Sequence, residues 1–166
     1  MYFENLTSPE LVKTEFRRLA MKHHPDVGGD NDTMRIIIEE YHAALKKLDG
    51  YESVGTDGRE HTYTYREAYE QAIIEKIEEL LGLHLDGVEI WIVGTWIWVD
   101  GNTRPYKEAL KKTGFTWIPF RRKWSWKPYH SKSRQRHTTA GFDSLCAKYG
   151  VRKIETDKEW TVSKVA

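Results

Sequence analysis

The chain is poor in cysteine and has no long apolar run, although 39% of its 166 residues are hydrophobic and 13% are aromatic. Its one cysteine, Cys146, cannot form an internal disulfide, which fits a reducing cytosol, and we expect it to be a small buried residue. The longest apolar run, 88–99, contains Glu89 and Gly94 and falls short of the ~20 residues that span a bilayer. No basic stretch followed by an apolar segment begins the chain. We therefore expect no secretory signal, no membrane contact and a cytoplasmic location.

A net charge of only +1 conceals a strong segregation of charge along the chain. Counted as Lys and Arg minus Asp and Glu, residues 1–50 carry −2, residues 51–103 carry −8, residues 104–136 carry +10 and residues 137–166 carry +1. Such asymmetry indicates either a surface for an acidic partner or two parts of one molecule that attract each other.

Two amphipathic helices are expected in residues 2–48, after a helical turn or two at 2–6. Ser8 is predicted to cap the first helix, and Asp30, Asn31 and Asp32 are predicted to supply a cap and an acidic first turn for the second. Because each helix has one apolar stripe, the two must pack together as an antiparallel hairpin. The stripes are Val12, Phe16, Leu19, Ala20 and His23 in the first helix, and Met34, Ile37, Ile38, Tyr41, Leu45 and Leu48 in the second. The other side of the first helix is basic and carries Lys13, Arg17, Arg18 and Lys22.

The connection "MKHHPDVGGD" is predicted to be a tight loop with an imidazole and a carboxylate at its tip. Pro25 stops the first helix near His24, and Gly28 and Gly29 allow the chain to turn back. A metal site is one alternative for the acids and histidines here. Their spacing fits neither a calcium loop nor a zinc site, so no metal is expected. The residues weighed for that site are His23, His24, Asp26, Asp30 and Asp32.

The segment "FRRLAMKHHPDVGGD" resembles the J domain of DnaJ-type co-chaperones, whose pattern is a basic helix ending in "LAxKxHPD" before an apolar helix. It is also similar to the J domains of polyomavirus large T antigens and of small J proteins of bacteria and mobile elements. The resemblance covers residues 2–48 and implies docking on a DnaK-type chaperone, whose ATP hydrolysis the J domain accelerates. The implied docking residues are Lys13, Arg17, Arg18 and Lys22 on the basic helix, with His24, Pro25 and Asp26 as the trigger.

The resemblance also limits what the chain is expected to do. A J domain biases its partner's conformation and supplies no catalytic group, so neither enzymatic activity nor a cofactor is expected. No zinc-binding cysteine repeats and no Gly/Phe-rich stretch follow, so the rest of the chain must select an unidentified client. The Trp-rich part also resembles the C-terminal part of small J proteins of bacteria and phages, which supplies no activity.

We predict an α+β protein with a J domain at 1–50, a flexible linker at 51–64 and a basic, Trp-rich α+β domain at 65–166. The last domain has the expected order helix, two strands, helix, two strands, helix. The ranges are a helix at 65–81, strands at 88–93 and 95–102 broken at Gly94, a helix ending at Lys112 and capped by Asn102 or Thr103, a hairpin turning at 119–122, a helix from 142 closed by Gly150, and an edge strand at 158–165.

Three interpretations of the basic, Trp-rich segment remain open. Cations that follow phosphates and rings that stack on bases would bind single-stranded nucleic acid. The segment could instead bind a protein client or viral partner, or its charges could face the acidic helix at 65–81 and be structural. The candidate nucleic-acid residues are Arg104, Lys107, Arg121, Arg122, Lys123, Trp124, Trp126 and Lys127.

Overall fold

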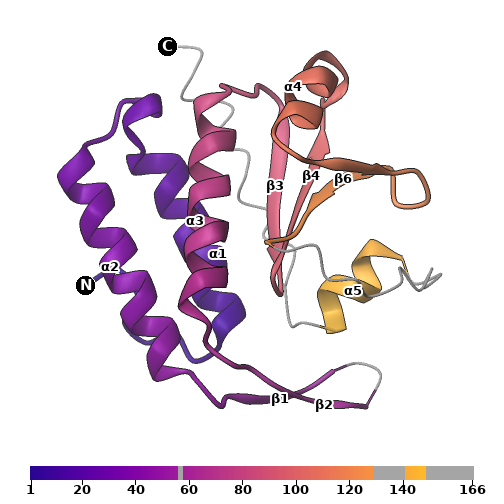
Figure 1. Cartoon of the computed structure of the whole chain (residues 1–166). Coiled ribbons are helices and arrows are strands. Elements are labelled where there is room, and N and C mark those ends of the chain that lie inside the picture. The colour runs from indigo at the N-terminus through magenta and orange to yellow at the C-terminus, as the bar shows by residue number, and fades with distance from the viewer. Residues whose placement is uncertain (56–57, 129–140, 149–166) are drawn as a thin grey trace.

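The computed structural model describes residues 1–55, 58–128 and 141–148 (Figure 1). The helices are α1 (Pro9–His23), α2 (Asn31–Lys47), α3 (Glu67–Gly82), α4 (Lys107–Lys112) and α5 (Phe142–Lys148), with short 3₁₀ turns at Pro25–Val27 and Arg104–Tyr106. The strands are β1 (Glu52–Val54), β2 (Glu60–Thr62), β3 (Val88–Val93), β4 (Trp96–Gly101), β5 (Thr116–Ile118) and β6 (Lys123–Trp126). Helices combined with antiparallel sheets make this an α+β protein, as predicted.

The first two helices form the predicted antiparallel hairpin. Each begins at its predicted cap, because the side chains of Ser8 and Asp30 accept the backbone N–H three residues further on. The apolar stripes meet between them, where the rings of Phe16 and Tyr41 lie 4.4 Å apart and are fully buried. The helix predicted before Ser8 does not form, and Phe3 packs into the core from a turn instead.

The four-stranded antiparallel sheet has the order β3-β4-β6-β5, so β3 and β5 are its edges. The predicted alternation of side chains is confirmed: Val99 lies opposite Trp124 in the neighbouring strand, on the face that packs into the main core with α1 and α3. Trp91 and Trp98 lie on the other face, where α5 covers them and Cys146 is buried among them.

The helical hairpin and the sheet share one hydrophobic core. In Figure 1, α3 stands between α2 and β3, and α1 runs alongside β3. One continuous cluster of buried side chains extends from Phe3 to Trp124. The predicted boundaries at 50 and 65 therefore do not separate two independently packed domains. The reason is that the apolar stripe of α3 packs against the hairpin as well as against the sheet.

The predicted flexible linker, 51–64, is wrong. Strands β1 and β2 pair in antiparallel fashion, and the pairing continues where Gly50 and Tyr63 are hydrogen-bonded through their backbones at 2.8 Å. The glycines that indicated flexibility instead build the turn, since Gly58, with φ 73°, donates its N–H to the carbonyl of Gly55 at 2.9 Å. The hairpin holds Tyr63 against α3, which is important for the site described below.

The remaining elements agree with the prediction except in one cap. The strands on both sides of Gly94 and the β5–β6 hairpin form where expected, but α4 begins after a 3₁₀ turn and has no side-chain cap from Asn102 or Thr103. The predicted helix end at Gly150 and the strand at 158–165 lie outside the described residues. None of the described helices has both the length and the apolarity of a membrane span.

Candidate functional site

The loop between α1 and α2 is tightly folded. His24 is extended, as a residue before proline should be, and Pro25 begins a single 3₁₀ turn. Gly28 ends this turn with a φ of 93°, a conformation that favours glycine. A Cβ atom on Gly29 would lie 1.8 Å from the carbonyl oxygen of His23, so only glycine fits there. The two glycines thus return the chain sharply into α2.

His24 does not present its imidazole to solvent, in contrast to the prediction. His24 is only 8% exposed, because the loop packs against the C-terminal part of α3. The ring nitrogen Nδ1 accepts the backbone N–H of Asp26 at 3.2 Å, which caps the 3₁₀ turn. His24 therefore fixes the loop from inside.

Asp26 is the exposed group of this loop. Its side chain is 48% exposed, and its Oδ2 lies 3.7 Å from His24 Nδ1. Gly82 at the end of α3 approaches the same carboxylate, since a Cβ there would lie 3.0 Å from Oδ2. Burial raises the pKa of the neighbouring Glu78, and the charges of Glu75 and Asp26 raise it further, whereas His24 lowers it. A hollow of about 450 Å³ opens beside the loop and is lined by His24, Asp26, Met34, Arg35, Ile38 and Glu78 among others.

Two of the four predicted docking cations are buried and do not lie on the exposed side of the helix, where the sequence placed them. Lys13 is 1% exposed and Arg17 is 5% exposed. Lys13 Nζ donates to the carbonyl of Gly94 at 2.7 Å, and Arg17 donates to the carbonyl of Ile90 while its guanidinium lies 5.4 Å from the ring centroid of Trp91. Strand β3 has no strand on its outer side, and α1 covers this edge: Arg17 binds a carbonyl of the strand and Lys13 binds one in the turn that follows it.

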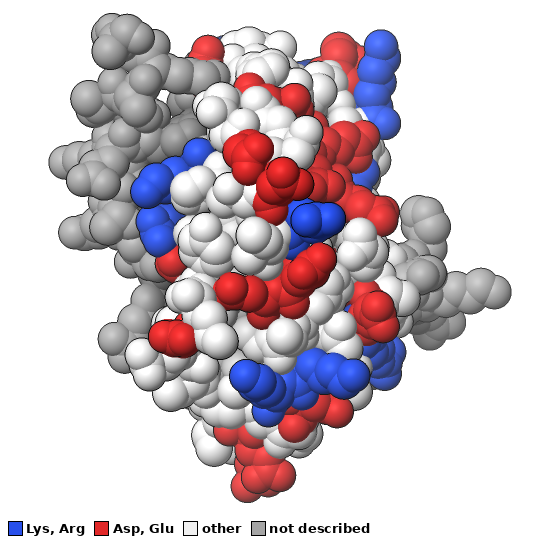
Figure 2. Space-filling view, turned by 90° about the vertical axis from the view of Figure 1, so that its left-hand side faces the viewer, with Lys and Arg blue, Asp and Glu red and all other residues white. Residues whose placement is uncertain are grey.

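The exposed cations of α1 are Arg18 and Lys22, one helical turn apart. The Arg18 side chain is 56% exposed and pairs with Glu15 at 2.5 Å, a hydrogen bond that raises the pKa of the guanidinium. Lys22 is exposed and has no ion pair within the described part of the chain. Figure 2 shows the neighbouring α2 side of the molecule, where acidic side chains are interspersed with basic ones, so no continuous basic surface crosses it.

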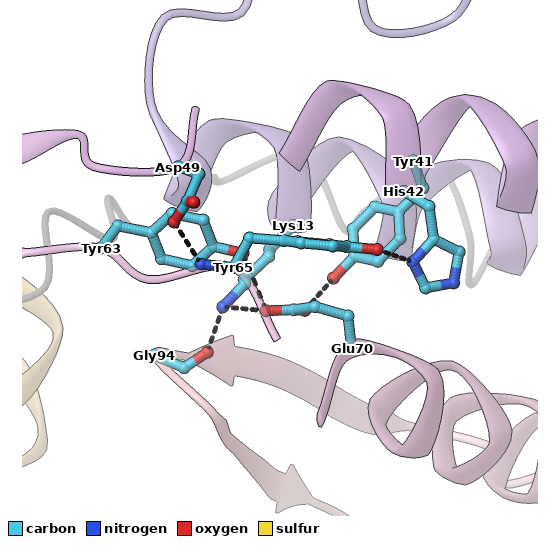
Figure 3. A network of polar contacts seen from close by, with 8 residues as sticks. All are labelled: Lys13, Tyr41, His42, Asp49, Tyr63, Tyr65, Glu70 and Gly94. Atoms are coloured by element: carbon cyan, nitrogen blue, oxygen red, sulfur yellow. Dashed lines mark hydrogen bonds and ion pairs between the residues drawn. The ribbon is translucent and has the colours of Figure 1, made fainter. Parts of the chain in front are cut away.

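A buried polar network joins the helical hairpin of α1 and α2 to the rest of the fold (Figure 3). At its centre Glu70 of α3, 1% exposed, accepts hydrogen bonds from the hydroxyls of Tyr41 at 2.8 Å and Tyr63 at 3.0 Å. Lys13 Nζ lies 3.4 Å from the same carboxylate. Burial, together with the charge of Glu70, raises the pKa of both tyrosines, so the hydroxyls remain protonated donors. The network is a structural joint between α1, α2, α3 and the turn after β3.

Glu10 lies near this network at an open hollow of about 720 Å³ between the start of α1, the β1–β2 hairpin and the turn after β3. Its Oε2 is buried and has no hydrogen-bond partner in the described structure. Burial raises the pKa of the Glu10 carboxyl above 4.5; Lys13 opposes this rise and Glu70 adds to it.

Replacing Glu10 by Gln is expected to stabilise the chain at pH 7. Because folding raises the pKa, the folded state holds the proton more tightly, and the wild type loses stability as pH rises from 4.5 through the folded value. The gap in Tm between the variant and the wild type should therefore shrink as pH falls from 7 to 4 in thermal unfolding. A gap that widens toward pH 4 would contradict the burial of this carboxylate.

Most of the predicted nucleic-acid residues are committed to the fold. Trp124 is buried in the core, Trp126 packs against it, and Lys123 pairs with Asp100. Two further cations lie over aromatic rings, Arg121 over Trp98 at 5.3 Å and Lys127 over Trp96 at 5.2 Å. The exposed members of the set are Arg104, Lys107 and Arg122. Two exposed rings that the sequence did not single out, Trp117 and Phe120, belong to the same segment of the chain, 104–122.

Neither a metal centre nor a reactive thiol is apparent in the described residues. No group of three or more His, Cys, Asp or Glu side chains converges within 1–55, 58–128 and 141–148. Burial, with a smaller contribution from Asp143, raises the pKa of the Cys146 thiol to about 11. The thiol is therefore protonated at neutral pH and is a packing group under the sheet, as expected from the sequence.

Comparison of the chain with protein-family models, with curated proteins and with solved structures finds no match.

Proposed function

We propose that the chain is a J-type co-chaperone that docks on a DnaK-type ATPase through the loop 24–26 and the exposed side of α1. The observation that carries this proposal is the Asp26 carboxylate, held half-exposed at the end of an antiparallel helical hairpin. A carboxylate in a fixed position can accept two hydrogen bonds from an arginine of the partner. In this role His24 holds the loop in shape, because it accepts the Asp26 N–H.

The exposed cations Arg18 and Lys22 would orient the encounter. Charges at the rim of an interface mainly change the association rate and its salt dependence. Lys13 and Arg17 take no part in this docking, because β3 and Glu70 occupy them. The partner would dock with the whole chain as one body, and the sheet would face a client or target protein. The chain would act by binding one conformation of the ATPase better than another.

The proposal is tested by steady-state ATP hydrolysis of a bacterial DnaK-type chaperone at increasing concentrations of the full chain. The wild type should raise the rate to a plateau. Arg18→Ala/Lys22→Ala should raise the half-saturating concentration roughly tenfold at low salt, since both steering charges are lost.

The matched control is Lys46→Ala/Lys47→Ala, which removes two exposed cations about 24 Å from the loop, at the other end of α2. It should leave the half-saturating concentration unchanged. Absence of stimulation by the wild type would overturn the proposal, and an equal loss in both double variants would show that the charges act without a defined site.

A further inference from the structure

We propose that the end of the β5–β6 hairpin is a binding surface for single-stranded nucleic acid. The surface, here called the hairpin patch, consists of the exposed residues Trp117, Phe120 and Arg122 of the hairpin, together with the exposed cations Arg104, Lys107 and Lys112 of the segment that precedes β5 in the chain. It includes three of the predicted residues and replaces the buried Trp124 and the partly buried Trp126 by two exposed rings. Figure 1 shows α4 and this hairpin on the side of the molecule away from α2.

The two rings are exposed, and they project from backbone that is held in place. Phe120 is 67% exposed at the tip, where Arg121 and Arg122 donate their N–H groups to Ile118 and Pro119 at 3.2 Å and fix the turn. Trp117 is 40% exposed on the edge strand β5, and its ring rests edge-on against Trp124 at 5.5 Å. Trp117 lies on the strand and Phe120 lies in the turn that follows it, three residues further along the chain. Fixed rings stack on bases at little cost in conformational entropy.

The segment that carries these rings is strongly basic. Between residues 101 and 128 there are eight Lys and Arg residues and one acid, Glu108, which pairs with Lys111 at 3.4 Å; Asp100, just before this range, pairs with Lys123. Four exposed cations have no ion pair among the described residues: Arg104, Lys107, Lys112 and Arg122. Free cations attract an anionic polymer, and the exposed rings distinguish the bases of a nucleic acid from the carboxylates of an acidic peptide.

The test is fluorescence anisotropy of a labelled dT20 oligonucleotide with the full chain at 50 mM and 200 mM salt. Phe120→Ala should weaken binding roughly 5- to 150-fold, the loss expected for one stacked base. The matched control, Val54→Ala, truncates a side chain of similar exposure, 69%, on β1 and should change nothing. Equal effects of the two variants would overturn the proposal, as would no binding by the wild type at 50 mM salt.

The charges are tested separately with Arg104→Gln/Lys107→Gln/Arg122→Gln. Loss of three phosphate contacts should reduce the slope of log affinity against log salt by about 2, since each contact to a single strand contributes about 0.7. The same change on α2, Arg35→Gln/Lys46→Gln/Lys47→Gln, should leave the slope unaltered. If polyglutamate of equal charge displaces the oligonucleotide as well as unlabelled dT20 does, the surface recognises acidic polymers and the assignment to nucleic acid fails. Neither result depends on the ATPase.

Discussion

Replacing Asp26 by Asn is expected to abolish the stimulation of a DnaK-type ATPase while the fold is retained. The side chain is 48% exposed, so the substitution should leave Tm nearly unchanged. The substitution removes the negative charge that would accept hydrogen bonds from an arginine of the partner. Truncation of one partner of such a charge pair costs about 2–5 kcal/mol, which is about 30-fold or more in affinity. Steady-state ATP hydrolysis, with thermal unfolding alongside, measures both quantities.

Two variants of His24 separate a positioning role from a direct contact. Asn places an acceptor oxygen where it can still receive the Asp26 N–H, whereas Ala cannot. We expect His24→Asn to retain most of the stimulation and His24→Ala to lose it. Equal loss in both variants would mean that the imidazole itself meets the partner. Full activity of Asp26→Asn would contradict the proposed docking.

Replacing Lys13 by Ala is expected to produce the largest loss of stability. The substitution leaves the Glu70 carboxylate buried with two tyrosine hydroxyls and no cation, and breaking a buried pair in this way costs about 3–5 kcal/mol. For a chain of this size the loss corresponds to a fall in Tm of about 6–20 °C. Differential scanning calorimetry is the direct measurement.

Two further variants control this experiment. Lys111→Ala breaks an exposed pair with Glu108 and should cost less than about 1 kcal/mol. The double variant Lys13→Ala/Glu70→Gln should be less destabilised than Lys13→Ala, because it no longer buries an uncompensated charge. If Lys13→Ala were no more harmful than Lys111→Ala, Lys13 would be solvated and the packing of α1 against β3 would be wrong.

The sequence predicted local structure well because local rules determine it. Ser8 and Asp30 cap their helices, Pro25 stops α1, and Gly94 separates two strands of alternating side chains. The sequence placed Lys13 on the exposed side of the first helix, and this prediction failed because the Lys13 ammonium binds the carbonyl of Gly94, 81 residues further along the chain. One feature could have indicated this contact. Glu70 lies on the same helical stripe as the buried isoleucines of α3, and an acid in that position needs a buried partner.

The exposure of the rings in the hairpin patch depends on the position of β5 in the sheet. The alternation around residues 115–128 predicted the hairpin and its turn, but it could not show that β5 is an edge strand. Trp117 and Trp124 lie opposite each other in neighbouring strands, yet one is 40% exposed and the other 4%. Strand order is set by contacts distant in sequence, so the sequence alone could not distinguish the exposed Trp117 from the buried Trp124.

The loop 24–26 and the hairpin patch lie on one continuous fold, so occupation of one surface does not require the other to move. This follows from the shared core, in which α1 binds the edge of β3 through Arg17 and Lys13. A DnaK-type chaperone at the loop and a nucleic acid at the hairpin could therefore be held by the same chain.

Amide hydrogen exchange of the full chain, with and without a DnaK-type chaperone, shows whether the loop 24–29 docks while α1 stays on the sheet. We expect slower exchange in the C-terminal half of α1 and in the loop 24–29, with β3 unchanged because α1 stays on its edge. Faster exchange in β3 on binding would contradict it, since α1 would then have left the sheet to offer Lys13 and Arg17 to the partner. No protection at the loop would equally contradict the proposed docking.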